Sequence, residues 1–118
     1  MFEATLSRVV SQVEGALGAA ILGYDGVLVL AVDAQGHLTA GDDADRAYAT
    51  VIKQLTSVGE AVELGELQAF TIEAADRTLL VRPLSAHYVV ALQVAPETVL
   101  GKGHFYLRVA APDLAREL

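Results

Sequence analysis

Residues 19–33 read Ala-Ala-Ile-Leu-Gly-Tyr-Asp-Gly-Val-Leu-Val-Leu-Ala-Val-Asp, two apolar runs separated by a polar break at Asp25-Gly26. Asp-Gly favours the positive φ values of a type I′ turn, whose twist matches that of two antiparallel strands, so this stretch predicts a β-hairpin. The second arm, Val27 to Val32, is apolar throughout instead of alternating, which is typical of a strand covered on both faces. We therefore expect other elements to pack above and below the hairpin.

Two amphipathic helices flank the hairpin and are the expected covers. The first, Phe2 to Ala16, gathers its apolar side chains in an arc of about 120°; they are Phe2, Leu6, Val9, Val10, Val13 and Leu17. The second runs from about Asp42 to Val62, with Asp42 as its N-cap and three carboxylates near the positive end of the helix dipole. Its predicted core stripe is Ala44, Tyr48, Val51, Ile52, Leu55, Val58 and Val62.

Three strands and a last helix are predicted for the rest of the chain. Short turns join the strands Glu66 to Glu73, Thr78 to Arg82 and His87 to Val94, which favours an antiparallel meander. A helix from about Thr98 follows, and Pro112 is expected to kink or restart it. The order is α-β-β-α-β-β-β-α, an α/β fold with five strands. In the last helix, Phe105 and Val109 point away from the apolar side, and the sequence assigns them no role.

Size, composition and charge limit the function classes. The 118 residues fit one domain, 1–118, and a composition with 53% hydrophobic and 19% charged residues excludes a disordered chain and favours a surface kept for a partner. The net charge is -7 and the basic residues are scattered, which argues against binding to nucleic acid or to an anionic membrane. No signal peptide or membrane span is visible, so a cytoplasmic location is expected.

No set of residues indicates catalysis. The three histidines, His37, His87 and His104, have no spacing that joins them into a metal or acid-base set. Gly101-Lys102-Gly103 lacks the distal Gly and the following Ser or Thr of a P-loop. The aspartates at the start of the middle helix lack the spacing of a calcium loop. We therefore predict no enzyme, no cofactor and no metal site.

Several stretches resemble the roadblock domain of the dynein light-chain and bacterial gliding-protein family. They are Val13-Glu14-Gly15-Ala16, Ala20-Ile21-Leu22-Gly23-Tyr24-Asp25-Gly26-Val27, Gly65-Glu66-Leu67 with Thr71-Ile72-Glu73, and Leu100-Gly101 to Leu107-Arg108. The resemblance implies a five-stranded antiparallel sandwich, with the middle helix on one face and the terminal helices on the other. It also implies homodimers in which middle helices lie side by side and third strands pair, and a non-catalytic role as regulator, GTPase-activating partner or scaffold of Ras-like small GTPases, or as a motor-complex adaptor.

Two surfaces are expected to carry this role. The small flank of the middle helix and the unprotected third strand predict the dimer interface, with Ala47, Thr50, Gln54, Ala61, Leu67, Phe70 and Ile72. The polar face of the middle helix is the expected partner-binding surface, with Arg46, Lys53, Ser57 and Glu60. The alternative is a sensor domain of similar architecture that holds a small ligand, although few polar groups other than Tyr24 and Tyr48 are predicted to face inward.

Overall fold

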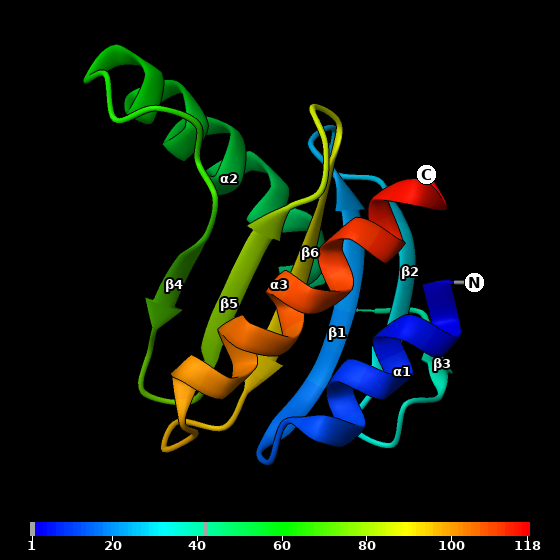
Figure 1. The fold of residues 1–118 in the computed structure, drawn as a ribbon. Coiled ribbons are helices and arrows are strands. Elements are labelled where there is room, and N and C mark those ends of the chain that lie inside the picture. The colour runs from blue at the N-terminus through cyan, green and yellow to red at the C-terminus, as the bar shows by residue number, and fades with distance from the viewer. Residues whose placement is uncertain (1, 42) are drawn as a thin grey trace.

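The first arm of the predicted hairpin lies at the centre of the sheet, and the second arm lies beside it (Figure 1). A computed structural model describes residues 2–41 and 43–118, of which the side chains of residues 43–46 and 49 are not described. The strand order in the single antiparallel sheet is β3-β2-β1-β6-β5-β4. The strands are β1 (Ala16–Gly23), β2 (Leu28–Asp33), β3 (Leu38–Thr39), β4 (Phe70–Glu73), β5 (Thr78–Pro83) and β6 (Tyr88–Val94), and the helices are α1 (Phe2–Gln12), α2 (Asp43–Ala61) and α3 (Leu100–Arg116).

The helices form the two covering layers that the sequence predicts. In Figure 1, α1 and α3 lie side by side across one face of the sheet, and α2 lies behind it. One core cluster joins α1 and α3 to the sheet around Leu6, Leu80 and Leu107, and a second joins Ile52 of α2 to the opposite face. The meander of β4, β5 and β6 is confirmed, but the described sheet has six strands instead of five, because the pair Leu38–Thr39 adds a short edge strand beside β2.

The hairpin turn differs from the predicted type I′. Such a turn needs positive φ at both central residues, Asp25 and Gly26. Asp25 does not have a positive φ; in the described part of the chain, Glu63 is the one non-glycine residue that does. Instead Gly26 adopts φ 88° and donates its N–H to the oxygen of Gly23 at 3.0 Å, while the N–H of Gly23 is bonded to the oxygen of Val27 at 2.9 Å. This is a three-residue loop closed by a left-handed glycine.

The covering of β2 on both faces is confirmed only near its centre. A β-bulge places Leu28 and Val29 opposite Leu22, and the residues on either side of it point to different core clusters. Leu30 and Val32 pack with α1 and α3, and Leu28 and Ala31 pack on the α2 side. Val27 and Val29 are 60% and 38% exposed, because they lie in the turn and in the bulge, where no helix covers them.

The predicted core stripe of α2 is wrong for most of its length. Ile52 is fully buried and Tyr48 is half-buried, but Leu55 and three valines of the same stripe are exposed. Figure 1 shows the cause, because α2 crosses behind the sheet and its C-terminal half continues beyond it. The expectations for Asp42 as N-cap, and for the side chains of Ala44 and Arg46, lie outside the described residues.

The ends of α1 and α3 also differ from the prediction. The first helix stops at Gln12, and Gly15 with φ 90° turns the chain into β1, so Leu17 is a strand residue that is 44% exposed instead of a core residue. The last helix continues through Pro112 without interruption. The carbonyl of Arg108, which loses its helical partner at Pro112, belongs to an exposed residue and can bond to water.

No helix in the described ranges is long and apolar enough to cross a bilayer.

Candidate functional site

Helix α2 presents an exposed apolar flank. We define its apolar stripe as Val51, Leu55, Val58 and Val62, which are 39%, 38%, 58% and 58% exposed. The spacing of four, three and four residues places these side chains on one side of the helix. Large aliphatic side chains gathered on one exposed face are typical of an interaction surface, whereas singly exposed ones are ordinary.

The edge of the sheet offers a second exposed feature. Strand β4 is terminal in the strand order, so its outer backbone groups have no neighbouring strand in the described chain. It is shorter than predicted, Phe70–Glu73 instead of Glu66 to Glu73, and Leu67 lies in the preceding linker. Ile72 is 37% exposed and Phe70 is half-buried against the α2 side of the sheet. Edges of this kind favour pairing with another strand.

The other predicted interface residues are exposed on α2. The structure places Ala47, Thr50, Gln54 and Ala61 at the surface. At 100° per residue, these four residues lie next to the apolar stripe around the helix axis, on the side of α2 that is turned away from the sheet. They therefore widen the exposed flank, and their role in a dimer stays a prediction.

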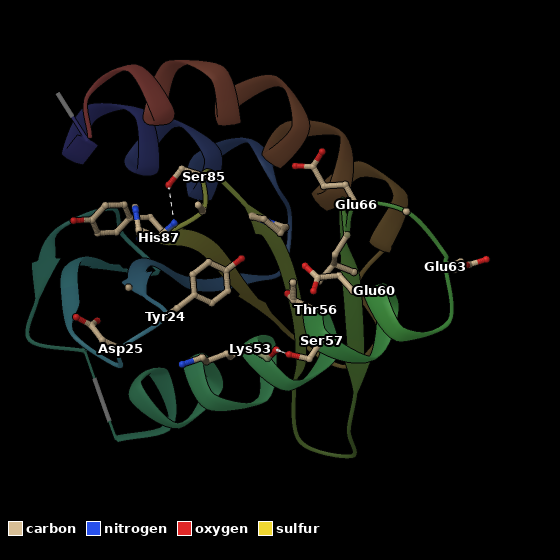
Figure 2. Close-up of a pocket in the computed structure, with 16 residues that line it drawn as sticks. Tyr24, Asp25, Lys53, Thr56, Ser57, Glu60, Glu63, Glu66, Ser85 and His87 are labelled. Atoms are coloured by element: carbon tan, nitrogen blue, oxygen red, sulfur yellow. Dashed lines mark hydrogen bonds between the residues drawn. The ribbon is translucent and has the colours of Figure 1, made fainter.

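The opposite flank of α2 forms one wall of a cleft of about 1150 Å³ (Figure 2). Lys53, Ser57 and Glu60, three of the four predicted partner-binding residues, line it together. The facing walls come from the β1–β2 turn, the β5–β6 turn and the linker between α2 and β4. Their lining side chains include Tyr24, Asp25, Pro83, Ser85, His87, Tyr88, Glu66 and Leu67.

Backbone hydrogen bonds fix the two turns that face α2. The N–H of Tyr24 donates to the oxygen of His87 at 3.0 Å, which ties the β1–β2 turn to the β5–β6 turn. The N–H of His87 in turn donates to Oγ of Ser85 at 3.1 Å (Figure 2). These bonds hold the wall that carries Tyr24 and His87 in one orientation.

The third wall begins where α2 ends. Glu63 adopts a left-handed φ of 56°, and the N–H of Leu64 bonds back to the oxygen of Gly59 at 3.0 Å. With the bond from the N–H of Glu63 to the oxygen of Glu60, this is the Schellman pattern that ends many helices. The chain then passes Gly65, with φ 89°, into the linker that borders the cleft.

Tyr24 is the central aromatic group of the cleft. Burial raises the pKa of its hydroxyl above 10.0, and a side-chain hydrogen bond with Thr56 lowers it to a smaller extent. Thr56 also donates its own hydroxyl to the oxygen of Ile52 at 3.0 Å. Tyr24 therefore remains a neutral phenol at pH 7, with its hydroxyl held against α2.

The charged groups of the cleft are not paired with one another. Asp25, Glu60, Glu63 and Glu66 line it beside a single lysine, Lys53, and no ion pair joins any of these five in the part of the chain that the structure describes. The same part holds no cluster of His, Asp and Glu that could bind a metal ion. The arrangement is suited to binding a charged or polar group.

Sequence reasoning missed most of the cleft. It placed Lys53, Ser57 and Glu60 together because they share a helix face, but it assigned no functional role to Tyr24 or Thr56. These residues come from a turn and a helix that are about thirty positions apart in the chain, so no periodic pattern links them. The run of glutamates at 60, 63 and 66 was the one available signal.

The outer face of α3 confirms that Phe105 and Val109 point away from the core, at 49% and 55% exposure. The guanidinium of Arg108 lies 5.9 Å from the centre of the Phe105 ring. On the side of α3 facing the sheet, His104 Nε2 and Thr71 Oγ1 are hydrogen-bonded at 2.6 Å, which connects α3 to β4. Desolvation, and then the charge of Arg82, lower the pKa of His104 below 6.5.

Comparison with known proteins identifies solved structures that share this fold. No protein-family model matches this sequence, and no curated protein matches it either. MglC from Myxococcus xanthus is 30% identical, with a TM-score of 0.72 over 99% of this chain and 98% of its own. A Roadblock/LC7 domain from Streptomyces avermitilis is 16% identical, with a TM-score of 0.74 over 98% and 95% of the two chains.

A third solved structure has the same fold at lower identity. MglB from Myxococcus xanthus is 13% identical, with a TM-score of 0.81 over 97% of this chain and 84% of its own. The matches extend over nearly all of this chain and include both helical layers of the sandwich. With the 30% identity to MglC, they show that this chain belongs to the roadblock domain family.

Proposed function

We propose that this protein is a non-catalytic homodimeric interaction module that binds and regulates a Ras-like small GTPase. The observation that carries the proposal is the apolar stripe of α2, because four large aliphatic side chains that a protomer leaves exposed are stabilised by burial against a second copy. The open edge at β4 supports it, since pairing with the same strand of the partner satisfies its free backbone groups. The roadblock resemblance implies both contacts.

The polar flank of α2 supports the regulatory part of the proposal. Lys53, Ser57 and Glu60 lie on the side of α2 away from the apolar stripe, so they stay accessible when the stripe is covered. A two-fold axis duplicates this surface, and a GTPase without that symmetry covers the axis once, which gives one GTPase per dimer. Discrimination between nucleotide states follows if the surface contacts the switch segments, because the γ-phosphate orders them.

The dimer is tested with a matched pair of variants. Light scattering at micromolar concentration should give twice 12.4 kDa for the unaltered chain. Val58→Glu places a carboxylate in the stripe and should give monomer, because an unpaired charge at the centre of an interface costs several kcal/mol. Val27→Glu is the control, since Val27 is similarly exposed, at 60% against 58%, but lies in the β1–β2 turn. A monomeric parent chain, or equal behaviour of both variants, contradicts the proposed interface.

GTPase binding is tested by calorimetry against a small GTPase recovered with the protein from its source cell. The GTPase is loaded in turn with GDP and with a GTP analogue, and we expect preference for one state at one GTPase per dimer. Lys53→Glu should weaken binding, whereas Lys102→Glu, on the exposed surface of α3, should not. Equal affinity for both nucleotide states would remove the regulatory claim.

A further inference from the structure

The cleft beside α2 is a binding site distinct from the apolar stripe. The two features lie on different flanks of the same helix, so covering one leaves the other open. The cleft is complete within one protomer, since its lining comes from α2, two turns and one linker of the same chain. It needs neither the proposed dimer nor a GTPase in order to form.

The size of the cleft favours a peptide over a small metabolite. Its volume of about 1150 Å³ exceeds the common range for small-molecule pockets, roughly 300 to 1,000 Å³. Its walls are four separate surface segments, namely α2, two turns and one linker, instead of a closed shell. Leu67 and Pro83 add apolar contacts that suit the aliphatic part of a long side chain.

The charges of the cleft are divided between its two ends. Figure 2 shows Lys53 extending toward the end where Asp25 lies, while Glu60 and Glu66 lie toward the other end and Glu63 points outward. Tyr24 projects between these ends, with its hydroxyl directed into the space. The end formed by Glu60, Glu66 and Tyr24 thus offers two carboxylates and an aromatic ring without a cation of its own.

We infer that this end of the cleft binds an arginine side chain carried on an extended segment of a partner protein. A guanidinium group donates five hydrogen bonds in one plane, and carboxylates are its strongest acceptors. An aromatic ring adds cation–π attraction. The arginine stem packs on Leu67 and Pro83, and its charge is compensated by Glu60 and Glu66.

The first test uses two pentapeptides that differ in one group. The ¹⁵N-labelled full chain is titrated with acetyl-Gly-Gly-Arg-Gly-Gly-amide and with the same peptide carrying citrulline, which has the shape of arginine but no charge. The arginine peptide should shift the backbone amide resonances of Tyr24, Thr56, Glu60 and Glu66 in a saturable way. The citrulline peptide should bind about three- to tenfold more weakly, because solvent reduces the strength of a partly exposed charge pair.

Three variants make the assignment specific. Glu60→Gln should weaken binding of the arginine peptide to a similar degree. Glu97 is an exposed carboxylate before α3, and Glu97→Gln should leave this binding unchanged. Lys53→Glu should strengthen peptide binding, because it replaces the nearby cation with a further carboxylate. The same variant should weaken binding of the GTPase in the proposed function. The two effects have opposite signs, so failure of the peptide proposal can be distinguished from failure of the GTPase proposal.

The inference is overturned by any of three results. Equal affinity for the arginine and citrulline peptides would show that charge is not recognised. Resonance shifts on α3 or at β4, with none at Tyr24 or Glu60, would place the peptide elsewhere. Equal effects of Glu60→Gln and Glu97→Gln would show that the peptide is attracted only by the general negative charge of the chain and not by this site.

Discussion

Replacing Ile52 and Leu55 by alanine tests how α2 is oriented. The two residues are less than one turn apart, yet Ile52 is 0% exposed and Leu55 is 38% exposed. Ile52 packs in the cluster with Leu22, Leu79 and Val81, so Ile52→Ala leaves a cavity and should cost about 2 to 5 kcal/mol. Leu55 already contacts solvent, and Leu55→Ala should cost about 1 kcal/mol or less in an isolated protomer.

The two variants should also respond differently to protein concentration. If the apolar stripe pairs two copies, the free energy of unfolding rises by about 2.7 kcal/mol per mole of dimer, or about 1.4 kcal/mol per protomer, for each hundredfold increase in concentration. Ile52→Ala should keep this dependence, because it alters the core and leaves the stripe intact. Leu55→Ala should lose most of it, because it removes one of the four stripe side chains.

Urea unfolding followed by circular dichroism, at two concentrations about a hundredfold apart, measures both effects. The reasoning is refuted if the two variants lose equal stability at the lower concentration, since α2 would then bury Leu55 as well as Ile52. It is also refuted if the midpoint of the parent chain is the same at both concentrations, because no copy would then cover the stripe.

Two further predictions concern α3. Gly101→Ala and Gly103→Ala bring the same gain in helix propensity, but a Cβ on Gly103 would lie 2.5 Å from Leu80 Cδ1, whereas a Cβ on Gly101 meets nothing within 4 Å. Thermal unfolding should therefore show the Gly103 variant to be roughly 1 to 3 kcal/mol less stable than the Gly101 variant. Equal stabilities of the two variants would contradict the close packing of Gly103 on Leu80. His104 has a pKa lowered from 6.5 by desolvation and then by Arg82, so the unfolded chain binds its proton more readily and this contribution to stability is lost as the pH falls below about 6.5. His104→Gln should flatten the stability profile between about pH 7 and 5, and an unchanged profile would exclude His104 as its source.

Local turn chemistry and hydrophobic periodicity predicted the helices and strands and a hairpin covered on both faces, whereas the arrangement of the three helices on the two faces was implied by the family resemblance. The Asp25-Gly26 break located the hairpin, although the left-handed residue is Gly26 alone and the turn type is different. The apolar run from Val27 to Val32 indicated a strand covered on both faces, which holds only near the centre of β2. The bulge at Leu28 and Val29 was not predictable, because the sequence gives no pairing register between the two arms.

Periodicity identified the apolar stripe of α2 but could not say what covers it. A stripe that packs on the sheet and one that packs on another copy have the same pattern of residues, so Leu55 and Val58 were placed in the core. The crossing position of α2 on the sheet decides between these two, and it depends on packing around Ile52. The cleft was unpredictable for a related reason, since Tyr24 and Glu66 become neighbours only through the tertiary fold.

The end of α2 has a consequence for how partner choice is encoded. Helix α2, its left-handed stop at Glu63 and strand β4 follow one another in the chain, so the apolar stripe and the open edge occupy one contiguous stretch, residues 43–73. The central strands β1 and β6 lie outside it. We expect this one segment to determine which partner is bound, so exchanging residues 43–73 between two related chains should transfer the choice of partner. An insertion in the linker between α2 and β4 should separate the helix contact from the strand contact.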